Sequence, residues 1–441
     1  MVYLKKTLAT LAKKTGFIKR QNILTALDFL LVMTVGQLGM KHPSLAAMVD
    51  AIESKISRES LHERFTESAA LFIEVCTQFV LRNKFQIPPL YTKLLKKFNH
   101  VFILDSSSWD IHSKLSNVLP GSGGNASDAN CKVQTFYEYK QGELSFVEIM
   151  PGNTPDSKYT RQIPEKIKKN DLLLTDLGYF CLKTFQLIIQ KGAFFVSRYK
   201  TGTSLWDTET SEPVELAKIL MRVKGNAYQM EVNMGTDKKT RICCRLICFR
   251  VKEEVANQRR MRLKREAKKK GRIPGAQSLL LADWTIIVTN VPEKWIPSEM
   301  LWRIYSIRWQ IELLFKQMKS IVQIHRSNTE NIQRLKCEIY GKLIMAILIN
   351  RIHGAINSEL WNTQKRELSM EKFYKRIQER AFQLLELLLT SFWKAVTYLS
   401  KEVDRLMKNC MKYQQPSRKS TLELLEEEID LKVEDLSACL A

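Results

Sequence analysis

The feature of this sequence that most constrains its fold is a pair of short apolar runs, each leading into an aspartate. Val101-Phe-Ile-Leu104 precedes Asp105, and Leu172-Leu-Leu174 precedes Thr175 and Asp176. Runs of this length and composition are typical of buried strands. A strand that ends in an aspartate presents a carboxylate at the rim of its sheet, where connections open a crevice. Each aspartate taken alone also fits an ordinary turn or capping residue.

The segments around these two runs predict further strands and helices in an α/β order. We expect a hairpin over Val133–Tyr139 and Leu144–Met150, helices over Lys158–Lys169 and Leu182–Gln190, and a strand over Ala193–Val196 that leads into Arg198. The resulting strand-strand-strand-helix-strand-helix-strand order resembles the layout of a ribonuclease H-like domain. Aspartates at the ends of two of its strands could therefore converge with an acid from elsewhere in the chain.

A third acid lies on a helix that we expect to run from about Pro297 to Ser320. Tyr305, Arg308, Glu312 and Lys319 are spaced by three, four and seven residues, which places them within an arc of roughly 60° on one helical face. Lys316 lies near that face, and an apolar stripe on another side would pack against a sheet. A carboxylate between cations suits a site that handles a metal ion and phosphate oxygens. An ordinary surface helix with paired charges gives the same spacing.

The charge balance points to a polyanionic partner. The chain has 441 residues with 69 Lys and Arg against 46 Asp and Glu, a formal net charge of +23. Such an excess favours nucleic acid, although a solubility charge or a membrane-facing patch remains an alternative. No apolar leader follows Met1, and Leu24–Met33 is too short to span a bilayer, so we expect a soluble cytoplasmic protein without a membrane partner. Nine scattered cysteines fit reduced thiols.

Residues 201–290 predict a mostly antiparallel segment with a strongly basic stretch. Strands are expected over Val214–Met221, Tyr228–Met234, Ile242–Phe249 and Asp283–Asn290. Arg259–Arg272 carries nine positive residues against one glutamate. That density favours a phosphate-contacting helix or loop, with Arg259, Arg260, Lys268 and Lys269 as candidate DNA-binding residues. A disordered basic tether is the alternative.

Both ends of the chain predict helices. Ile23–Val35, Ser44–Ile52 and Arg58–Arg82, the last with Ser57 as its N-cap, are expected near the N-terminus. They suit either a helix-turn-helix unit or an ordinary helical bundle. Ile339–Ile352 and Phe382–Leu399 follow as apolar or amphipathic helices suited to bundling or self-association. A short acidic helix is expected over Leu422–Glu434.

The pattern Tyr305-x2-Arg308-x3-Glu312-x6-Lys319, downstream of Asp105 and Asp176, resembles the signature of the DDE transposases of bacterial insertion sequences. Asp176-Leu-Gly-Tyr-Phe180 and Arg308-Trp-Gln-Ile-Glu312 resemble the local contexts in that family. The resemblance implies a ribonuclease H-like α/β core, interrupted by a β-rich insertion and flanked by helical domains. The implied division is 1–95 helical and DNA-binding, 96–200 first part of the core, 201–290 insertion, 291–336 second part of the core, 337–413 helical and dimerising, and 414–441 linker and acidic tail.

The resemblance also implies a function. Asp105, Asp176 and Glu312 would bind two Mg²⁺ ions about 3.5–4 Å apart, with Mn²⁺ as a substitute ion, for in-line attack on a phosphodiester. The protein would cut double-stranded DNA at terminal inverted repeats and join the 3′-hydroxyl ends to target DNA, as a homodimer on the bacterial nucleoid. Phosphate contacts are expected from Tyr305, Arg308, Lys319, Lys316 and Arg198.

The same resemblance gives Trp284 a role in stacking on a base flipped from the DNA end, although a core tryptophan is the alternative. Two other functions remain open at this point. One is a catalytically inactive DNA-binding regulator on a transposase scaffold. The other is a repair or resolving nuclease, which would stop at hydrolysis.

Overall fold

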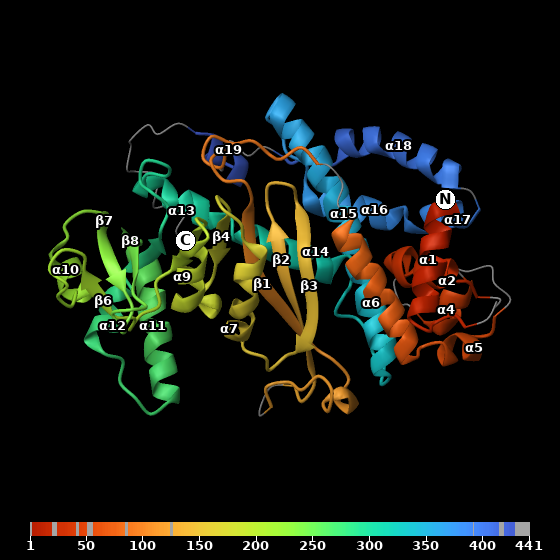
Figure 1. Ribbon diagram of the computed structural model, residues 1–441, viewed down its shortest axis with the longest axis horizontal. Coiled ribbons are helices and arrows are strands. Elements are labelled where there is room, and N and C mark those ends of the chain that lie inside the picture. The colour runs from red at the N-terminus through yellow and green to blue at the C-terminus, as the bar shows by residue number, and fades with distance from the viewer. Residues whose placement is uncertain are drawn as a thin grey trace. The chain divides into compact units, whose positions relative to one another are not determined.

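The computed structural model describes residues 2–19, 24–40, 44–50, 56–83, 87–123, 127–390, 392–413 and 419–427. The chain divides into two compact units (Figure 1). We call them the helical unit, formed by residues 1–91, 105–154 and 309–416, and the sheet unit, formed by residues 92–104, 155–308 and 417–441. The sheet unit contains both apolar runs, Val101–Leu104 and Leu172–Leu174.

The sheet unit is built on strands in the order β1-β4-β5-β9-β8-β7-β6. Strand β4 is parallel to both of its neighbours, β1 and β5, and the pairs β5–β9, β9–β8, β8–β7 and β7–β6 are antiparallel. Their bounds are Val101–Asp110 for β1, Leu172–Thr175 for β4, Phe194–Arg198 for β5, Leu205–Asp207 for β6, Ala227–Met234 for β7, Ile242–Arg250 for β8 and Trp284–Thr289 for β9. Every side chain of β4 and β9 is buried, as their apolar runs predict.

Helices and short turns connect these strands. They are α7 (Asp156–Tyr159), η3 (Thr160–Gln162), α8 (Ile163–Lys166), η4 (Leu177–Tyr179), α9 (Leu182–Gln190), α10 (Leu216–Arg222), α11 (Glu253–Lys269), α12 (Ala276–Leu281), α13 (Ser298–Ser306) and α19 (Thr421–Glu426). The prediction of α9 is confirmed. The single helix expected over Lys158–Lys169 is wrong, because it is divided into α7, η3 and α8, with Pro164 in the first turn of α8, where a missing N–H costs no helical bond.

The strand expected over Val214–Met221 is also wrong, because this segment forms α10. Leu216, Ala217 and Leu220 are its buried residues. The second and third of these residues follow the first by one and four positions, which places all three on one side of a helix. In a half-buried strand, buried and exposed residues would alternate instead. The other strands expected between 201 and 290 are present as β7, β8 and β9. The treatment of 201–290 as a separate insertion remains a prediction.

The helical unit contains β2 (Asn130–Glu138), β3 (Glu143–Pro151), the last six residues of β1 and a set of helices. The helices are α1 (Val2–Lys14), α2 (Ala26–Leu31), the π-helix η1 (Val32–Gly36), α3 (Gln37–Gly39), α4 (Leu45–Asp50), α5 (Arg58–Glu63), α6 (Glu67–Arg82), η2 (Ser113–Leu115), α14 (Trp309–Ser320), α15 (Ile332–Gln364), α16 (Met370–Glu379), α17 (Ala381–Thr390) and α18 (Phe392–Asn409). The predicted β2–β3 hairpin is confirmed.

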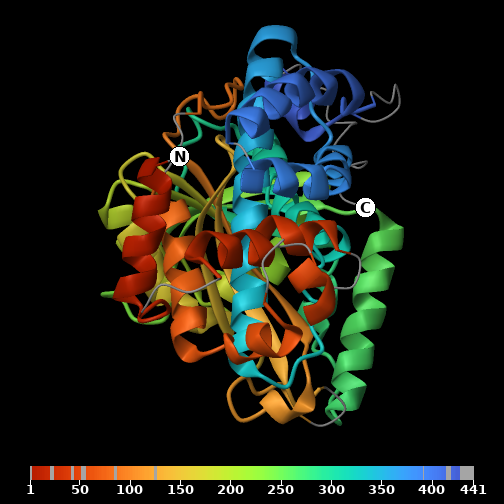
Figure 2. The same cartoon turned by 90° about the vertical axis from the view of Figure 1, so that its right-hand side faces the viewer.

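Helix α15 forms the core of the helical unit. It packs against α6, η1, α3 and β3, and Figure 2 shows it running behind the N-terminal helices. Its length and apolar composition would suffice to cross a bilayer, but 83% of the apolar stretch is buried inside the protein. Gly341 sits where a Cβ would lie 1.9 Å from the Met33 carbonyl oxygen of η1, so only glycine permits this close approach.

One of the predicted terminal helices is broken. Arg58–Arg82 divides into α5 and α6, because Thr66 accepts a hydrogen bond from the Ala69 amide and starts a new helix as its N-cap. Ser57 caps α5 as predicted. The predicted helix Phe382–Leu399 falls on α17 and α18. Parts of four predicted helices, namely residue 23, residues 51–52, residue 391 and residues 428–434, lie outside the described residues.

Candidate active site

The register of two parallel strands aligns the residues that precede the first two predicted acids. Leu104 of β1 pairs with Thr175 of β4. Asp105 directly follows Leu104 in the sequence, and Asp176 directly follows Thr175. Each acid therefore comes immediately after a residue of this pair. Neighbouring strands lie roughly 4.8 Å apart, and equivalent side chains of parallel strands point to the same face. The sequence alone identified the two acids, and the register shows that the strand residues before them are paired.

Asp105 lies inside a strand rather than at its end, which corrects our expectation. β1 continues to Asp110, and the Asp105 carbonyl oxygen accepts hydrogen bonds from the side chains of Gln134 and Thr135 in β2, at 3.0 and 3.1 Å. The strand continues because β2 replaces β4 as a source of partners for its backbone. The Asp105 carboxylate accepts a hydrogen bond from the Ser106 amide at 2.8 Å. Asp176, by contrast, directly follows the last residue of β4, as predicted.

The helix expected from Pro297 to Ser320 is two helices, α13 and α14, which meet at Ile307 and Arg308. The amides of these two residues bond to the carbonyls of Ile304 and Tyr305, in the tighter pattern of a 3₁₀ turn. The Ser306 hydroxyl also donates to the Arg303 carbonyl at 2.7 Å, a bond that bends helices. The prediction of one continuous helix is therefore wrong. Tyr305 belongs to α13, and Glu312 and Lys319 belong to α14.

Four of the predicted site residues interact within the sheet unit. Tyr305 is 2% exposed, and burial raises the pKa of its phenol, which the Asp176 charge raises further and the Arg308 and Arg198 charges oppose. The Arg308 guanidinium lies 6.0 Å from the centre of the Tyr305 ring. The Tyr305 hydroxyl is buried and donates no hydrogen bond among the described residues, and hydrogen bonding from Arg308 lowers the pKa of its phenol. Two guanidinium groups and an unused O–H donor beside a carboxylate form a suitable place for a phosphate.

The last signature residue, Lys319, contacts β1 within the helical unit. Its ammonium group donates to the Ser108 carbonyl at 2.9 Å and lies 5.9 Å from the centre of the Trp109 ring. Burial lowers the pKa of this lysine. Glu312 lies exposed in the first turn of α14, and Lys316 is exposed one turn later. The bond from Lys319 thus ties the helix that carries Glu312 to the strand that carries Asp105.

The three predicted metal ligands are distributed over both units. Asp105 and Glu312 belong to the helical unit, and Asp176 belongs to the sheet unit. Among the residues that the structure describes, no three His, Cys, Asp or Glu side chains are grouped closely enough to hold a metal ion. The chemistry of the set nevertheless fits a divalent cation, because carboxylate oxygens are the ligands that Mg²⁺ prefers and two of the three follow paired residues. The three-acid site stays a prediction.

Trp284 is a core side chain in this structure. Its ring is 3% exposed, and the Arg250 guanidinium covers it at 4.4 Å from the ring centre. A base could stack on this ring only after Arg250 moved away. The alternative that the sequence left open, a tryptophan of the core, describes the observed conformation.

Helix α11 uses its basic residues in two ways. Arg259 donates to the Trp284 carbonyl at 3.2 Å and the Thr285 hydroxyl at 3.0 Å, and Arg260 pairs with Asp283 and Glu253. These two arginines hold α11 against the start of β9 and its preceding residue. Lys268 and Lys269 are exposed near the end of the helix. Of the four DNA-binding residues predicted on α11, the two lysines are the ones whose exposed ammonium groups are available to contact DNA phosphates.

Sequence reasoning missed the residue that fixes the start of α13. Arg245 of β8 is 8% exposed and donates to the Val291 and Ile296 carbonyls at 2.9 and 3.0 Å and to the Ser298 hydroxyl at 2.5 Å. Burial lowers the pKa of this guanidinium, and Glu293 opposes the shift. The only sequence signal was an arginine within an apolar strand, which is rare unless the charge is used.

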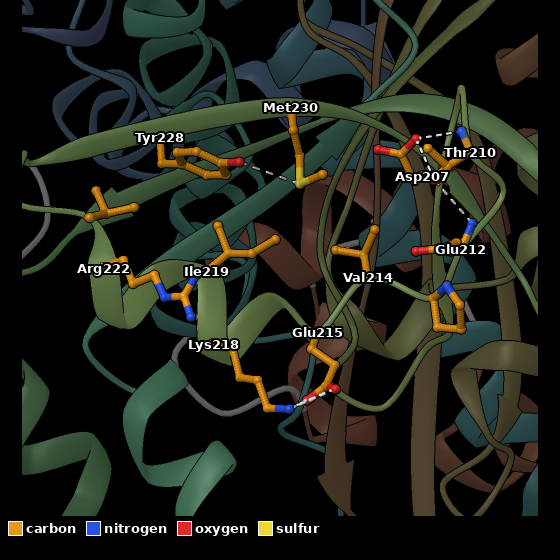
Figure 3. A pocket seen from close by; sticks show the side chains of 12 residues that line it. Asp207, Thr210, Glu212, Val214, Glu215, Lys218, Ile219, Arg222, Tyr228 and Met230 are labelled. Carbon is orange, nitrogen blue, oxygen red and sulfur yellow. Dashed lines mark hydrogen bonds and ion pairs between the residues drawn. The ribbon is translucent and has the colours of Figure 1, made fainter.

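A cavity of about 540 Å³ lies beside α10 and β7 (Figure 3). Figure 3 shows apolar side chains, including Ile219 and Met230, between an acidic rim at Asp207 and Glu212 and the basic Arg222. Its mixed charge does not select a polyanion. None of Asp105, Asp176 and Glu312 contributes to it.

Comparison with known proteins identifies the family. The profile of the family described as "Transposase DDE domain" matches residues 96–348. The chain is 28% identical to the transposase for insertion sequence element IS231E of Bacillus thuringiensis subsp. finitimus, over 95% of this chain and 92% of that protein. It is 27% identical to the transposase for insertion sequence element IS1151 of Clostridium perfringens, over 93% and 90%.

Among solved structures, a piggyBac transposase synaptic complex with hairpin DNA aligns with a TM-score of 0.47 at 10% identity, covering 94% of this chain and 84% of that one. The family profile spans more than half of the chain, and the relatives named above match nearly all of it. The matched range, residues 96–348, includes the three predicted acids and the four signature residues. The chain therefore belongs to the family of DDE transposases of bacterial insertion sequences.

Proposed function

We propose that this transposase works by a cut-and-paste reaction. It binds the terminal inverted repeats of its element, hydrolyses a phosphodiester at each end and transfers the freed 3′-hydroxyl groups to target DNA. The observation that supports this best is the parallel register, in which Asp105 and Asp176 follow the paired residues Leu104 and Thr175. A metal-dependent phosphoryl-transfer site needs carboxylates from separate segments of the chain, and this pairing supports Asp105 and Asp176 as two of them.

Asp105, Asp176 and Glu312 are the residues that would hold two Mg²⁺ ions, with Mn²⁺ as a substitute. Bound there, such ions supply activation of a water nucleophile and charge stabilisation of the leaving 3′-oxygen. The Lys319–Ser108 bond supports the participation of Glu312, because it ties α14 to the same strand that carries Asp105. No side chain is required as a covalent nucleophile, since positioning and electrostatics dominate phosphoryl transfer.

The cationic side chains around these acids would hold the DNA backbone. Tyr305, Arg308 and Arg198 interact electrostatically around Asp176, where the buried Tyr305 hydroxyl has a free donor. Lys319 and Lys316 lie on α14, and Lys268 and Lys269 extend the cationic surface on α11. The net charge of +23 supports double-stranded DNA as the partner.

The remaining predictions concern organisation. Joining two ends at once requires one catalytic centre for each end, so we propose a homodimer in the complex that holds them. Residues 1–95 would contribute DNA binding and residues 337–413 dimerisation. The proposed location is the cytoplasm, at the bacterial nucleoid, where the DNA substrate lies. The exposed helix α5, with Arg58 and His62, suits groove contact as well as it suits an ordinary bundle surface.

The test uses purified protein with DNA that carries the element's own ends and a divalent cation. Asp105→Asn, Asp176→Asn and Glu312→Gln should each remove strand cleavage while end binding is retained, because each substitution keeps the shape and removes an anionic ligand. Asp110→Asn is the matched control, since Asp110 lies on the same strand and is exposed. This control should cleave like the unmodified protein.

The products separate the possible reactions. Cut-and-paste transposition joins the 3′ ends to a new strand, whereas a nuclease stops after hydrolysis and a regulator binds without cleavage. Robust Mg²⁺-dependent cleavage by any of the three acid variants would refute the proposed triad. Equal activity with and without a divalent cation would refute the metal-dependent reaction.

A further inference from the structure

The C-terminal segment 419–427, which we call the C-terminal strap, contains α19 and belongs to the sheet unit. The sequence predicted only a linker and an acidic tail with a short helix in this part of the chain. In the structure it is a docked element. Leu422 and Leu425 are 2% and 0% exposed, and Ser420 and Glu423 form a reciprocal capping box at the start of α19.

The strap depends on its surroundings for its helical form. A helix of six residues is too short to be stable in water by itself, because nucleation costs more than so few hydrogen bonds return. The two buried leucines and the capping box supply what the short helix lacks. We therefore expect α19 to be helical only while it is packed against the rest of the sheet unit.

One partner of the strap is α13, the helix that carries Tyr305. The Arg303 guanidinium donates to the Leu424 carbonyl at 3.1 Å and pairs with the Glu427 carboxylate at 2.9 Å. The last carbonyls of a helix have no partner within it, so Arg303 acts as a cap for the end of α19. Lys419 pairs with the same glutamate. Arg303 lies two residues before Tyr305 and five before Arg308.

The other partner of the strap is the segment that leads into β1. The Leu94 amide donates to the Leu425 carbonyl at 3.4 Å, and the Lys93 amide donates to the Glu426 carboxylate at 3.3 Å. Leu94 and Leu95 are themselves buried. The strap thus holds together the approach to the strand of Asp105 and the helix of Tyr305, which are more than 200 residues apart in the sequence.

We propose that the C-terminal strap is a positioning element of the catalytic centre, and that Arg303 is a positioning residue that fixes α13 through it. Arg245 holds the start of α13 and the strap holds its later turns, so the place of Tyr305 and Arg308 depends on both. The catalytic part of this inference rests on the proposed function of Tyr305 and Arg308. The structural part, that docking of α19 orders α13, does not.

The first experiment measures amide hydrogen exchange of α13 in the full-length protein without DNA. Leu425→Asp and Arg303→Ala should each accelerate exchange at residues 299–306 by about tenfold or more, because loss of the strap lowers the local opening free energy. Leu425→Met keeps the volume and apolar character of the side chain and should leave exchange unchanged. Unchanged exchange in a folded Leu425→Asp or Arg303→Ala protein would overturn the proposal, whatever the activity.

The second experiment measures single-turnover cleavage at saturating DNA together with end-binding affinity. Leu425→Asp and Arg303→Ala should lower the cleavage rate by about tenfold or more with little change in affinity, because misplacement by about 1 Å is costly to chemistry. A protein that ends after Glu427 retains the strap and should cleave normally. Full cleavage without the strap would overturn its catalytic role. A different result is that the unmodified protein cleaves no DNA while the variants still show the expected faster hydrogen exchange in α13. That result would refute the proposed function, but the inference that the strap orders α13 would stand.

Discussion

At the scale of single residues, some predicted site residues have side chains available to bind a ligand, and others are engaged in contacts that stabilise the fold. Arg259 and Arg260 look like phosphate contacts in the sequence but are committed to Trp284, Thr285, Asp283 and Glu253. The sequence cannot reveal this, because a basic run does not show which side chains turn inward. The spacing of three residues predicted that Tyr305 and Arg308 lie close together, and the charges of Arg308 and of Asp176, an acid after a distant strand, both act on the Tyr305 phenol.

Lys342 of α15 is a buried cation that fixes the segment after α14. It is 2% exposed and donates to the Gln323 and Arg326 carbonyls at 3.1 and 2.8 Å. Gln323 adopts a left-handed backbone with φ of 55°, so this turn carries strain that the lysine helps to hold. Burial lowers the pKa of Lys342 to about 8, with Glu338 opposing the shift and Arg326 and Arg334 adding to it.

The titration of Lys342 should appear in the pH dependence of stability. Between pH 8 and 10 the unfolded chain keeps this proton and the folded protein releases it, so the lysine's contribution to stability rises with pH by about 2 kcal/mol. Lys342→Met removes that contribution. We expect the difference in unfolding free energy between the two proteins, measured by denaturant titration, to move in favour of the unmodified protein over this range. A pH-independent difference would contradict the assignment.

At the scale of elements, strands were predicted better than helix boundaries. The apolar runs over β1, β4 and β9 and the alternation over β2 and β3 fix their strands locally. The breaks at Thr66, Pro164 and Ile307 depend on caps and turns whose side-chain bonds compete with the helix, as Ser306 does with the Arg303 carbonyl. The extension of β1 beyond Asp105 required knowledge of β2 as a partner, which is a contact distant in sequence.

A second prediction concerns Arg351, which joins three elements of the helical unit. This residue of α15 is 1% exposed, donates to the Val80, Leu81 and Asn83 carbonyls at the end of α6, and pairs with Glu143 of β3 at 3.3 Å. Arg351→Ala leaves a buried carboxylate and several carbonyls without their donor. It should lower the free energy of unfolding by about 3–5 kcal/mol.

The matched control for Arg351 is Arg366→Ala, because Arg366 is exposed just beyond the end of α15. Denaturant unfolding should place that control within about 0.5 kcal/mol of the unmodified protein. A loss below about 1 kcal/mol in Arg351→Ala would mean that Arg351 does not carry the junction of α6, α15 and β3.

At the scale of the whole molecule, the charge excess should appear as a steep salt dependence of DNA binding. Replacing Lys268 and Lys269 together by Ala should reduce the slope of log affinity against log salt by about two, because each phosphate contact releases roughly 0.9 of a counterion. Arg260→Ala is the control on the same helix, since two acids already neutralise Arg260. An unchanged slope in the double lysine variant would remove α11 from the DNA-binding surface.

The path of the chain between its two units has a consequence for how such genes decay. The chain passes between the helical unit and the sheet unit five times, after residues 91, 104, 154, 308 and 416. A stop codon before residue 417 therefore leaves both units incomplete. A copy truncated in this way cannot express one intact unit that would compete with the full protein for DNA ends, so truncated copies should be inactive rather than inhibitory.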